Sequence, residues 1–237
     1  MQTGKRQNRC GKDSSGFTLL EILLAIFIFS IMITTLFGSF NQILGNAGII
    51  EENIVFNEMA KICLDRMILD LQGIYVTPAL QYSQPEMHSD PDIHQVLGEE
   101  SSSQNRDFPR LRFTSSAHVS FGRNQINGVA EIVYYVGETD ENMVVLKRSD
   151  RLDFGKPLEE DRHDPVLCEK LKSITFTFYD KDGEEHSSWD SESSQLDYET
   201  PLSIAIHLEL GDETGSYHYL TRVQLPVYRV QPGQASS

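Results

Sequence analysis

One carboxylate stands inside the most apolar stretch of this sequence. Glu21 is the only charged residue in the run FTLLEILLAIFIFSIMITTLFGSF, which extends from Phe17 to Phe40. A carboxylate in an apolar membrane segment costs about 2.5–3.5 kcal/mol on insertion scales, and such residues usually have a function. The chemistry open to Glu21 in that setting is the neutralisation of a nearby cation, because opposite charges attract strongly where the dielectric is low.

The run that contains Glu21 has the length of a membrane-spanning helix. At about 1.5 Å per residue, residues 19–40 make a helix about 33 Å long, which matches a hydrocarbon core about 30 Å thick. The residues before the run carry four basic side chains and one acid, namely Lys5, Arg6, Arg9, Lys12 and Asp13. Basic residues that flank a span stay in the cytoplasm, so we expect the C-terminal bulk of the chain to lie on the other side of the membrane.

Two common N-terminal signals fit this region poorly. A secretory signal peptide has a shorter apolar run with a small-residue cleavage site after it, whereas here the small residue, Gly16, precedes a long run. A lipoprotein signal needs apolar residues before its cysteine, and Cys10 has none. A plain membrane anchor stays open, but it leaves Glu21 unexplained.

The residues Gly16-Phe17-Thr18-Leu19-Leu20-Glu21, with the basic leader and the apolar run, resemble the cleavage and methylation signature of type IV prepilins and type II secretion pseudopilins. In that family the prepilin peptidase, a membrane enzyme, cuts after the glycine and methylates the new terminal amine. The resemblance implies that residues 1–16 are a cleaved leader, that Phe17 becomes the N-methylated end, and that Glu21 lies five places into the mature chain. We hypothesise that Glu21 neutralises this ammonium, on its own or a neighbouring subunit, and so helps to set subunit register.

Apolar spacing predicts that the helix continues beyond the membrane. We expect one helix over residues 17–77, with its transmembrane part at about 19–40 and its end at Pro78. Gly45 and Gly48 lie in its middle, where a bend or local melting is expected because glycine weakens helices. Residues that recur at intervals of three and four should form one buried face, and these are Phe56, Ala60, Cys63, Met67, Leu71 and Ile74.

The rest of the chain reads as a loop followed by a β-rich head. Residues 78–107 form a polar loop rich in serine and proline. From residue 110 the apolar period changes to two, and strands are expected at 110–114, 131–136, 143–148, 173–179, 184–189, 202–210 and 217–225. Asp182-Gly183 predicts a hairpin turn. The prediction is an α+β fold, with the long helix packed on a mainly antiparallel head at 108–229 and a flexible tail at 230–237.

Histidines offer only weak candidates for a metal site. His88 and His94 lie six residues apart in the polar loop, which is not a helical ligand spacing. If the turn in GDETG closes symmetrically, His207 lies opposite His218 on a polar face, and Tyr217 and Tyr219 share the core face. No third ligand is evident, so ordinary surface histidines are the simpler interpretation.

Acidic segments suggest solvated loops more than ion sites. The sequence DKDGEE lacks the spacing of an EF-hand loop and is interpreted as a turn. The acids at 159–164 and 190–199 read as loop charges, although clustered carboxylates also suit calcium, which stays open. No metal or cofactor is therefore assigned.

The lack of catalytic motifs argues against an enzyme, and the net charge argues against nucleic acid as a partner. The sequence has no GxSxG, P-loop, HExxH or CxxC pattern, and so offers no arranged nucleophile, base or cofactor loop. With 20 Lys and Arg against 35 Asp and Glu, the net charge is −15, which disfavours contact with a phosphate backbone.

Cys63 and Cys168 could pair outside the cytoplasm, but separate buried thiols are the simpler interpretation.

The C-terminal half is similar to one class of pseudopilin. The segment LKSITFTFYDKDGEEHSSWDS, then Pro201-Leu202-Ser203-Ile204-Ala205-Ile206, then Arg222-Val223-Gln224-Leu225-Pro226, resembles the J-class minor pseudopilins of type II secretion systems, as does the helix segment 64–71. This resemblance implies a head with two antiparallel sheets that lies in the periplasm, on a helix anchored in the inner membrane. It also implies assembly with I- and K-class minor pseudopilins and the major pseudopilin, at the pseudopilus tip that initiates the filament.

Two other functions stay open. One is a minor pilin of a type IV pilus, used for adhesion or DNA uptake. The other is a membrane-tethered binding domain that does not polymerise. Neighbouring genes for a secretin and an assembly ATPase would favour the secretion system over the pilus, and co-purification with a filament would exclude the tethered domain.

Overall fold

The computed structural model describes residues 18–85, 91–100, 108–119, 128–153, 163–213 and 215–230, without the side chains of residues 42–53. The chain divides into two compact units, Met1–Asn53 and Ile54–Ser237. Several predicted features lie outside the described residues, namely the leader at 1–16, Phe17, His88, the acids at 159–161 and the tail from 231.

A single long helix, α1 (Leu19–Gln72), carries the apolar run. Its first 23 residues, Leu19–Asn41, have a mean hydropathy of 2.5 and are long and apolar enough to cross a membrane. The hydroxyls of Ser30, Thr34 and Thr35 donate to backbone carbonyls of the preceding turn at 2.7–2.9 Å, so these three groups are satisfied within the helix. The helix is unbroken through Gly45 and Gly48, so the local melting expected there is not observed.

The helix ends at Gln72, earlier than the predicted 77, because the chain turns into a strand. Gly73 closes the last turn by donating to Leu69 O at 3.0 Å, and its own carbonyl accepts Ser116 N at 2.8 Å. A Cβ at this glycine would lie 2.7 Å from Ser115 Oγ, so only glycine allows the approach. The next residues form β1 (Ile74–Tyr75), which pairs with β3 (Arg110–Ser115). Strand pairing, and not Pro78, therefore ends the helix.

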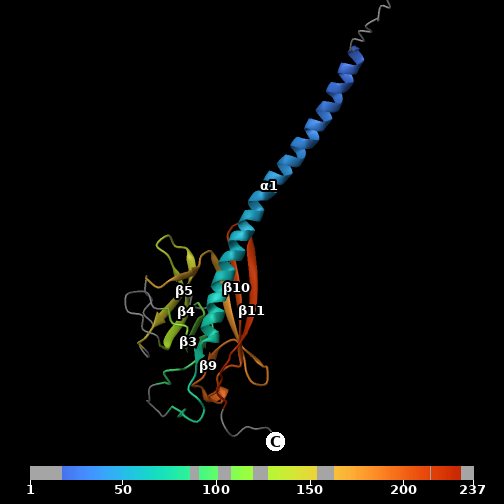
Figure 1. Cartoon of the computed structure of the whole chain (residues 1–237). Coiled ribbons are helices and arrows are strands. Elements are labelled where there is room, and N and C mark those ends of the chain that lie inside the picture. The colour runs from blue at the N-terminus through green and yellow to red at the C-terminus, as the bar shows by residue number, and fades with distance from the viewer. Residues whose placement is uncertain are drawn as a thin grey trace, which may run out of the picture. The chain divides into compact units, whose positions relative to one another are not determined.

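The head consists of two antiparallel sheets, as Figure 1 shows. The seven-stranded sheet has the order β6-β5-β4-β3-β2-β9, with β1 also paired to β3. The four-stranded sheet has the order β11-β10-β7-β8. Their remaining strands are β2 (Leu97–Glu99), β4 (Ala130–Glu138), β5 (Val144–Arg151), β6 (Val166–Cys168), β7 (Leu171–Tyr179), β8 (Glu185–His186), β9 (Trp189–Asp190), β10 (Ser203–Gly211) and β11 (Ser216–Gln224), with a short 3-10 helix, η1 (Ser194–Leu196). The predicted α+β fold with two sheets is confirmed.

One face of α1 packs against both sheets. The predicted face is confirmed from Phe56 to Leu71, since its residues there are at most 2% exposed. Ile74 is also buried, but it lies in β1 and not in the helix. Phe56 stacks on Tyr217 of β11 with ring centroids 4.8 Å apart, and the Tyr219 hydroxyl donates to Asn57 at 3.0 Å. On the other side, Ser115 of β3 donates to the carbonyl of Asp70 at 2.7 Å. The second half of the helix is thus the central element of the head (Figure 1).

The predicted single strand at 184–189 is wrong. It is two short strands in different sheets, because β8 pairs with β7 whereas β9 pairs with β2. The Trp189 ring is the reason, since it is 2% exposed and its Nε1 donates to Glu199 O at 3.1 Å. Placing this ring in the core requires the chain to leave one sheet and enter the other. The turn at Asp182-Gly183 is confirmed, with Gly183 at a φ of +85°.

Short strands were also missed where the sequence is polar. The predicted loop at 78–107 contains β2, and Val96 just before it is fully buried. The strand β6 was not predicted, and it pairs with β5 at the edge of the larger sheet. Such strands of two or three residues have too few positions to show a period of two.

A buried arginine bonds the C-terminal segment to the rest of the head. Arg229 is 1% exposed, and it donates to Asp92 at 2.9 Å, to Glu192 at 3.2 Å and to the carbonyls of Ser191 and Tyr198 at 2.8 Å. The C-terminal segment is thereby bonded to three separate loops, and the ordered head extends to the last residues that the structure describes.

A glycine in β2 is expected to tolerate no side chain. A Cβ at Gly98 would lie 2.0 Å from Phe178 Cζ, and Phe178 is fully buried. We predict that Gly98→Ala lowers the free energy of unfolding by about 1–3 kcal/mol, the usual cost of overpacking a core. Gly215→Ala is the control, because nothing lies within 4 Å of its Cβ position. Equal midpoints for the two variants in urea denaturation would contradict this prediction.

Candidate functional site

The first turn of α1 presents Glu21 in a capped helix terminus. The Glu21 backbone N–H donates to Thr18 Oγ1 at 3.3 Å and to Thr18 O at 3.0 Å, and Ile22 N donates to the same carbonyl at 3.3 Å. Thr18 therefore occupies the N-cap position, where a threonine satisfies a free N–H group of the first turn. With Glu21 three residues later, the spacing is that of a capping box.

This geometry allows two roles for the Glu21 carboxylate. At the N-terminus of a helix, an acid is favoured by the helix dipole, which contributes about 0.3–1 kcal/mol. That local role needs no partner subunit. The assembly role requires a cation from a processed N-terminus, and Phe17 lies outside the described residues. The Glu21 side chain is exposed in the isolated chain, so it is free to meet another molecule.

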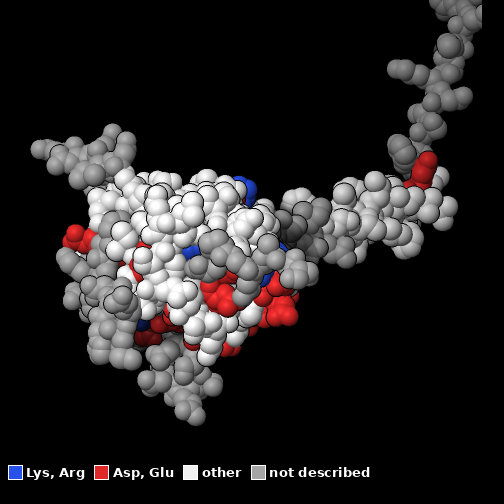
Figure 2. All heavy atoms as spheres, turned by 90° about the horizontal axis from the view of Figure 1, so that it is seen from below, with Lys and Arg blue, Asp and Glu red and all other residues white. Residues whose placement is uncertain are grey.

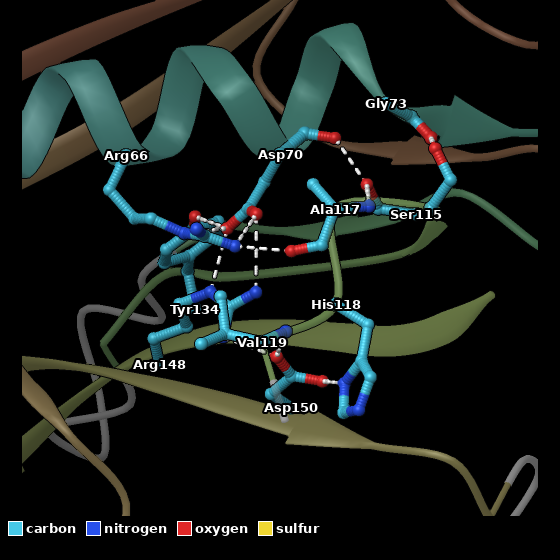
Figure 3. A network of polar contacts seen from close by, with 11 residues as sticks. Arg66, Asp70, Gly73, Ser115, Ala117, His118, Val119, Tyr134, Arg148 and Asp150 are labelled. Atoms are coloured by element: carbon cyan, nitrogen blue, oxygen red, sulfur yellow. Dashed lines mark hydrogen bonds and ion pairs between the residues drawn. The ribbon is translucent and has the colours of Figure 1, made fainter. Parts of the chain in front are cut away.

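A second group of charged residues lies buried in the head, where α1 meets β4 and β5 (Figure 3). Asp70 has a side chain that is 0% exposed. It accepts hydrogen bonds from Arg148 Nε at 2.7 Å and Arg148 Nη2 at 3.1 Å, from Arg66 Nη2 at 2.5 Å, and from the Tyr134 hydroxyl. The carboxylate is thus held by one residue of its own helix and by two residues of neighbouring strands.

The network continues beyond Arg148. Its Nη1 donates to Asp150 Oδ2 at 2.7 Å, and the same carboxylate accepts Val119 N at 3.0 Å and contacts His118 Nδ1 at 2.5 Å. Hydrogen bonds from Val119, His118 and Arg148 outweigh the effect of burial, which acts in the opposite direction, and lower the pKa of Asp150. Burial and the neighbouring Asp70 charge raise the pKa of Tyr134, so its hydroxyl stays a donor.

This network is structural in character. Two arginines and two aspartates alternate in it, so their charges cancel within the head. Its effect is to attach α1 to the larger sheet at a defined rotation and height. This network was not predicted from the sequence. Asp70 lies three places after Met67, on the predicted core face, and an acid on such a face was the available signal.

The turn between β7 and β8 holds a group that could bind a metal ion. Ligand atoms of Asp180, Glu184 and His186 lie within 4.8 Å of one another. The Asp180 carboxylate already accepts backbone N–H groups of Asp182 at 2.9 Å and Glu184 at 2.8 Å, and it contacts His186 Nε2 at 3.1 Å. This pattern is that of a side chain closing a turn, as the sequence analysis predicted for DKDGEE.

The predicted pairing of His207 with His218 is wrong in register. His207 lies opposite Leu220, and His218 lies opposite Glu209. The turn after β10 is therefore not symmetric about GDETG, and the two histidines are diagonal neighbours whose ring centroids are 5.6 Å apart. Tyr217 and Tyr219 do pack against the core, as predicted.

Acidic side chains gather on one face of the head. Figure 2 shows patches of acidic side chains and few basic ones on the face that it presents. This distribution agrees with the net charge of −15.

Comparison with known families adds an independent observation at the N-terminus. Residues 11–37 match the family model described as the prokaryotic N-terminal methylation motif. The match includes Gly16, Phe17 and Glu21 and most of the apolar part of α1. No curated protein matches the chain.

Proposed function

Because the N-terminal methylation motif indicates a type IV pilin-like or pseudopilin protein, we propose that this chain is a minor pseudopilin of a type II secretion system. In this proposal it joins other minor pseudopilins at the tip of the pseudopilus and initiates the filament that drives secretion. Proteins with this motif are structural subunits, and the motif implies processing by a prepilin peptidase and assembly with other pilin-like subunits.

The proposed maturation follows from the residues at the motif. The peptidase cuts between Gly16 and Phe17 and methylates the amine of Phe17. The single apolar helix fits a membrane anchor with a soluble head, and we propose that the anchor crosses the inner membrane and the head faces the periplasm. After cleavage, the new ammonium belongs to the residue four places before Glu21 in the sequence.

The choice of a minor pseudopilin rests on the C-terminal half. The resemblance to J-class sequences runs through β7, the turn at Asp182-Gly183, Trp189 and the strand that follows Pro201. The described head agrees with the two antiparallel sheets that this resemblance implies. The proposed partners are the I- and K-class minor pseudopilins and the major pseudopilin.

The test is co-purification of the full chain from membranes. The chain would be expressed with a prepilin peptidase and with I- and K-class minor pseudopilins, extracted in mild detergent and recovered through a tag on its C-terminus. We expect a stable ternary complex in which mass spectrometry finds N-methylated Phe17 as the first residue. A type IV pilus assembly system, expressed in parallel, is the control.

Each outcome decides one part of the proposal. Recovery with pilus subunits and not with minor pseudopilins would favour a minor pilin. A correctly processed chain that associates with neither set would contradict a role at either tip. Retention of Met1 would overturn the processing step, and with it the filament function.

A further inference from the structure

Two free thiols meet in the core of the head. Cys63 of α1 and Cys168 of β6 are 0% and 2% exposed, and both are unpaired cysteines. Both belong to one cluster of buried side chains, and Cys168 is the neighbour that acts most strongly on the Cys63 thiol, although about 100 residues separate the two in the sequence.

The backbone itself places them together. Cys168 lies directly opposite Leu146 in the pairing of β6 with β5, so both side chains point to the same face of the sheet. Arg148, two residues after Leu146, points to that face too, and it reaches Asp70 at 2.7 Å. Asp70 lies two helical turns after Cys63. The two thiols and the Asp70–Arg148 pair therefore lie along one interface between α1 and the larger sheet.

We propose that Cys63 and Cys168 form a disulfide bond that joins α1 covalently to β6. In this step both S–H bonds break and one S–S bond forms. The two protons and two electrons pass to the disulfide of a thiol–disulfide oxidoreductase, which becomes a dithiol. The pairing follows from the geometry of the head alone, whereas its oxidation in the cell rests on the proposed periplasmic location, since such bonds persist in oxidising compartments.

The bond would secure the helix that carries the anchor. A filament subunit transmits force between its membrane helix and its head, and the interface of α1 with the larger sheet otherwise depends on packing and on the Asp70 network. The neighbouring Cys168 and burial together raise the pKa of the Cys63 thiol. Since the thiolate is the reacting species, oxidation should be slow in the folded head and should occur mainly while the head folds.

The first experiment counts thiols in the full chain in cells. Cys10→Ser removes the remaining cysteine, so that any bond within one chain must join Cys63 to Cys168. Cells are quenched in acid, and the denatured protein is labelled with a maleimide of high mass. We expect no labelled thiol before reduction and two after it. The Cys168→Ser variant in the same background is the control and should show one labelled thiol in both samples.

The second experiment separates the pair from its location. The purified full chain, in detergent, is equilibrated with glutathione redox buffers at alkaline pH, and the cross-linked peptide is sought by mass spectrometry. Bond formation in glutathione but not in cells would support the pair and contradict the periplasmic location. Two free thiols under both conditions would overturn the inference, and would leave the processing and partner tests of the proposed function unaffected.

The oxidised head should also melt at a higher temperature. A bond that closes a loop of about 100 residues restricts the unfolded chain strongly, and for a head of this size we expect the reductant to lower Tm by about 5–15 °C. The Cys168→Ser variant should melt at the same temperature with and without reductant. An equal Tm for the oxidised and reduced forms would contradict a bond made without strain in this geometry.

Discussion

Replacing Asp70 with asparagine should lower the free energy of unfolding of the head by about 3–5 kcal/mol, the usual cost of breaking a buried ion pair. The side chain keeps its shape, but Arg148 loses one of its two charged partners and retains only Asp150, while its own side chain remains 3% exposed. The Tyr134 hydroxyl also loses a charged acceptor. Urea denaturation followed by fluorescence measures this loss, because the only tryptophan, Trp189, lies in the core of the head.

The same helix supplies a matched control for this variant. Asp65 also pairs with a basic residue four positions away, Lys61 at 3.0 Å, but the two side chains are 56% and 76% exposed. Exposed pairs of this kind contribute little, so Asp65→Asn should change the free energy of unfolding by less than about 0.5 kcal/mol. If Asp70→Asn and Asp65→Asn unfold at the same urea concentration, the buried network does not stabilise the head.

A double-mutant cycle would show that the loss comes from an uncompensated charge. Arg148→Met leaves Asp70 with Arg66 and Tyr134 as partners, and it also removes a donor from Asp150. Combined with Asp70→Leu, it removes both members of the central pair. We expect the double variant to lose about 1–3 kcal/mol less free energy of unfolding than the single variants Asp70→Leu and Arg148→Met lose in total.

Periodic features of the fold were predictable because they are local. The buried face of α1 follows from intervals of three and four residues, and the long strands β7, β10 and β11 follow from alternation. Trp189 shows the limit of this approach. Its neighbours look like the continuation of one strand, but the sheet that it joins is decided by the space available for its ring between elements distant in sequence.

Glu21 and the Asp70 network also differ in how far the sequence alone reveals them. Glu21 stands out in the sequence because a charge in an apolar run is conspicuous by itself, and its capping spacing to Thr18 can also be read there. Asp70 lies on an amphipathic helix where acids are common. Its partners Tyr134 and Arg148 come from β4 and β5, and the register of those strands decides which side chains reach it. The position of Asp70 on the predicted core face can be read from the sequence, but only the tertiary structure shows which residues pair with it.

Substitution of Glu21 should have the largest effect on function, by removing the chain from the filament without affecting its processing. If the carboxylate pairs with the ammonium of Phe17 in an apolar environment, its loss costs about 3–5 kcal/mol, which corresponds to a factor of at least about 100 in incorporation. The measurement is the amount of the chain in purified filaments relative to the amount processed in the membrane.

Glutamine at position 21 separates the two roles of this side chain. It keeps the capping-box spacing with Thr18, because either Glu or Gln can occupy this position of the motif, but it removes the charge. If Glu21 neutralises an ammonium, then Glu21→Gln and Glu21→Ala should both fail to enter the filament. Thr18→Ala removes the observed cap at a cost of about 0.5–2 kcal/mol, and it should leave the chain competent for assembly. Normal incorporation of Glu21→Gln together with loss of Glu21→Ala and Thr18→Ala would show instead that the first turn of the helix needs a cap and no counter-charge.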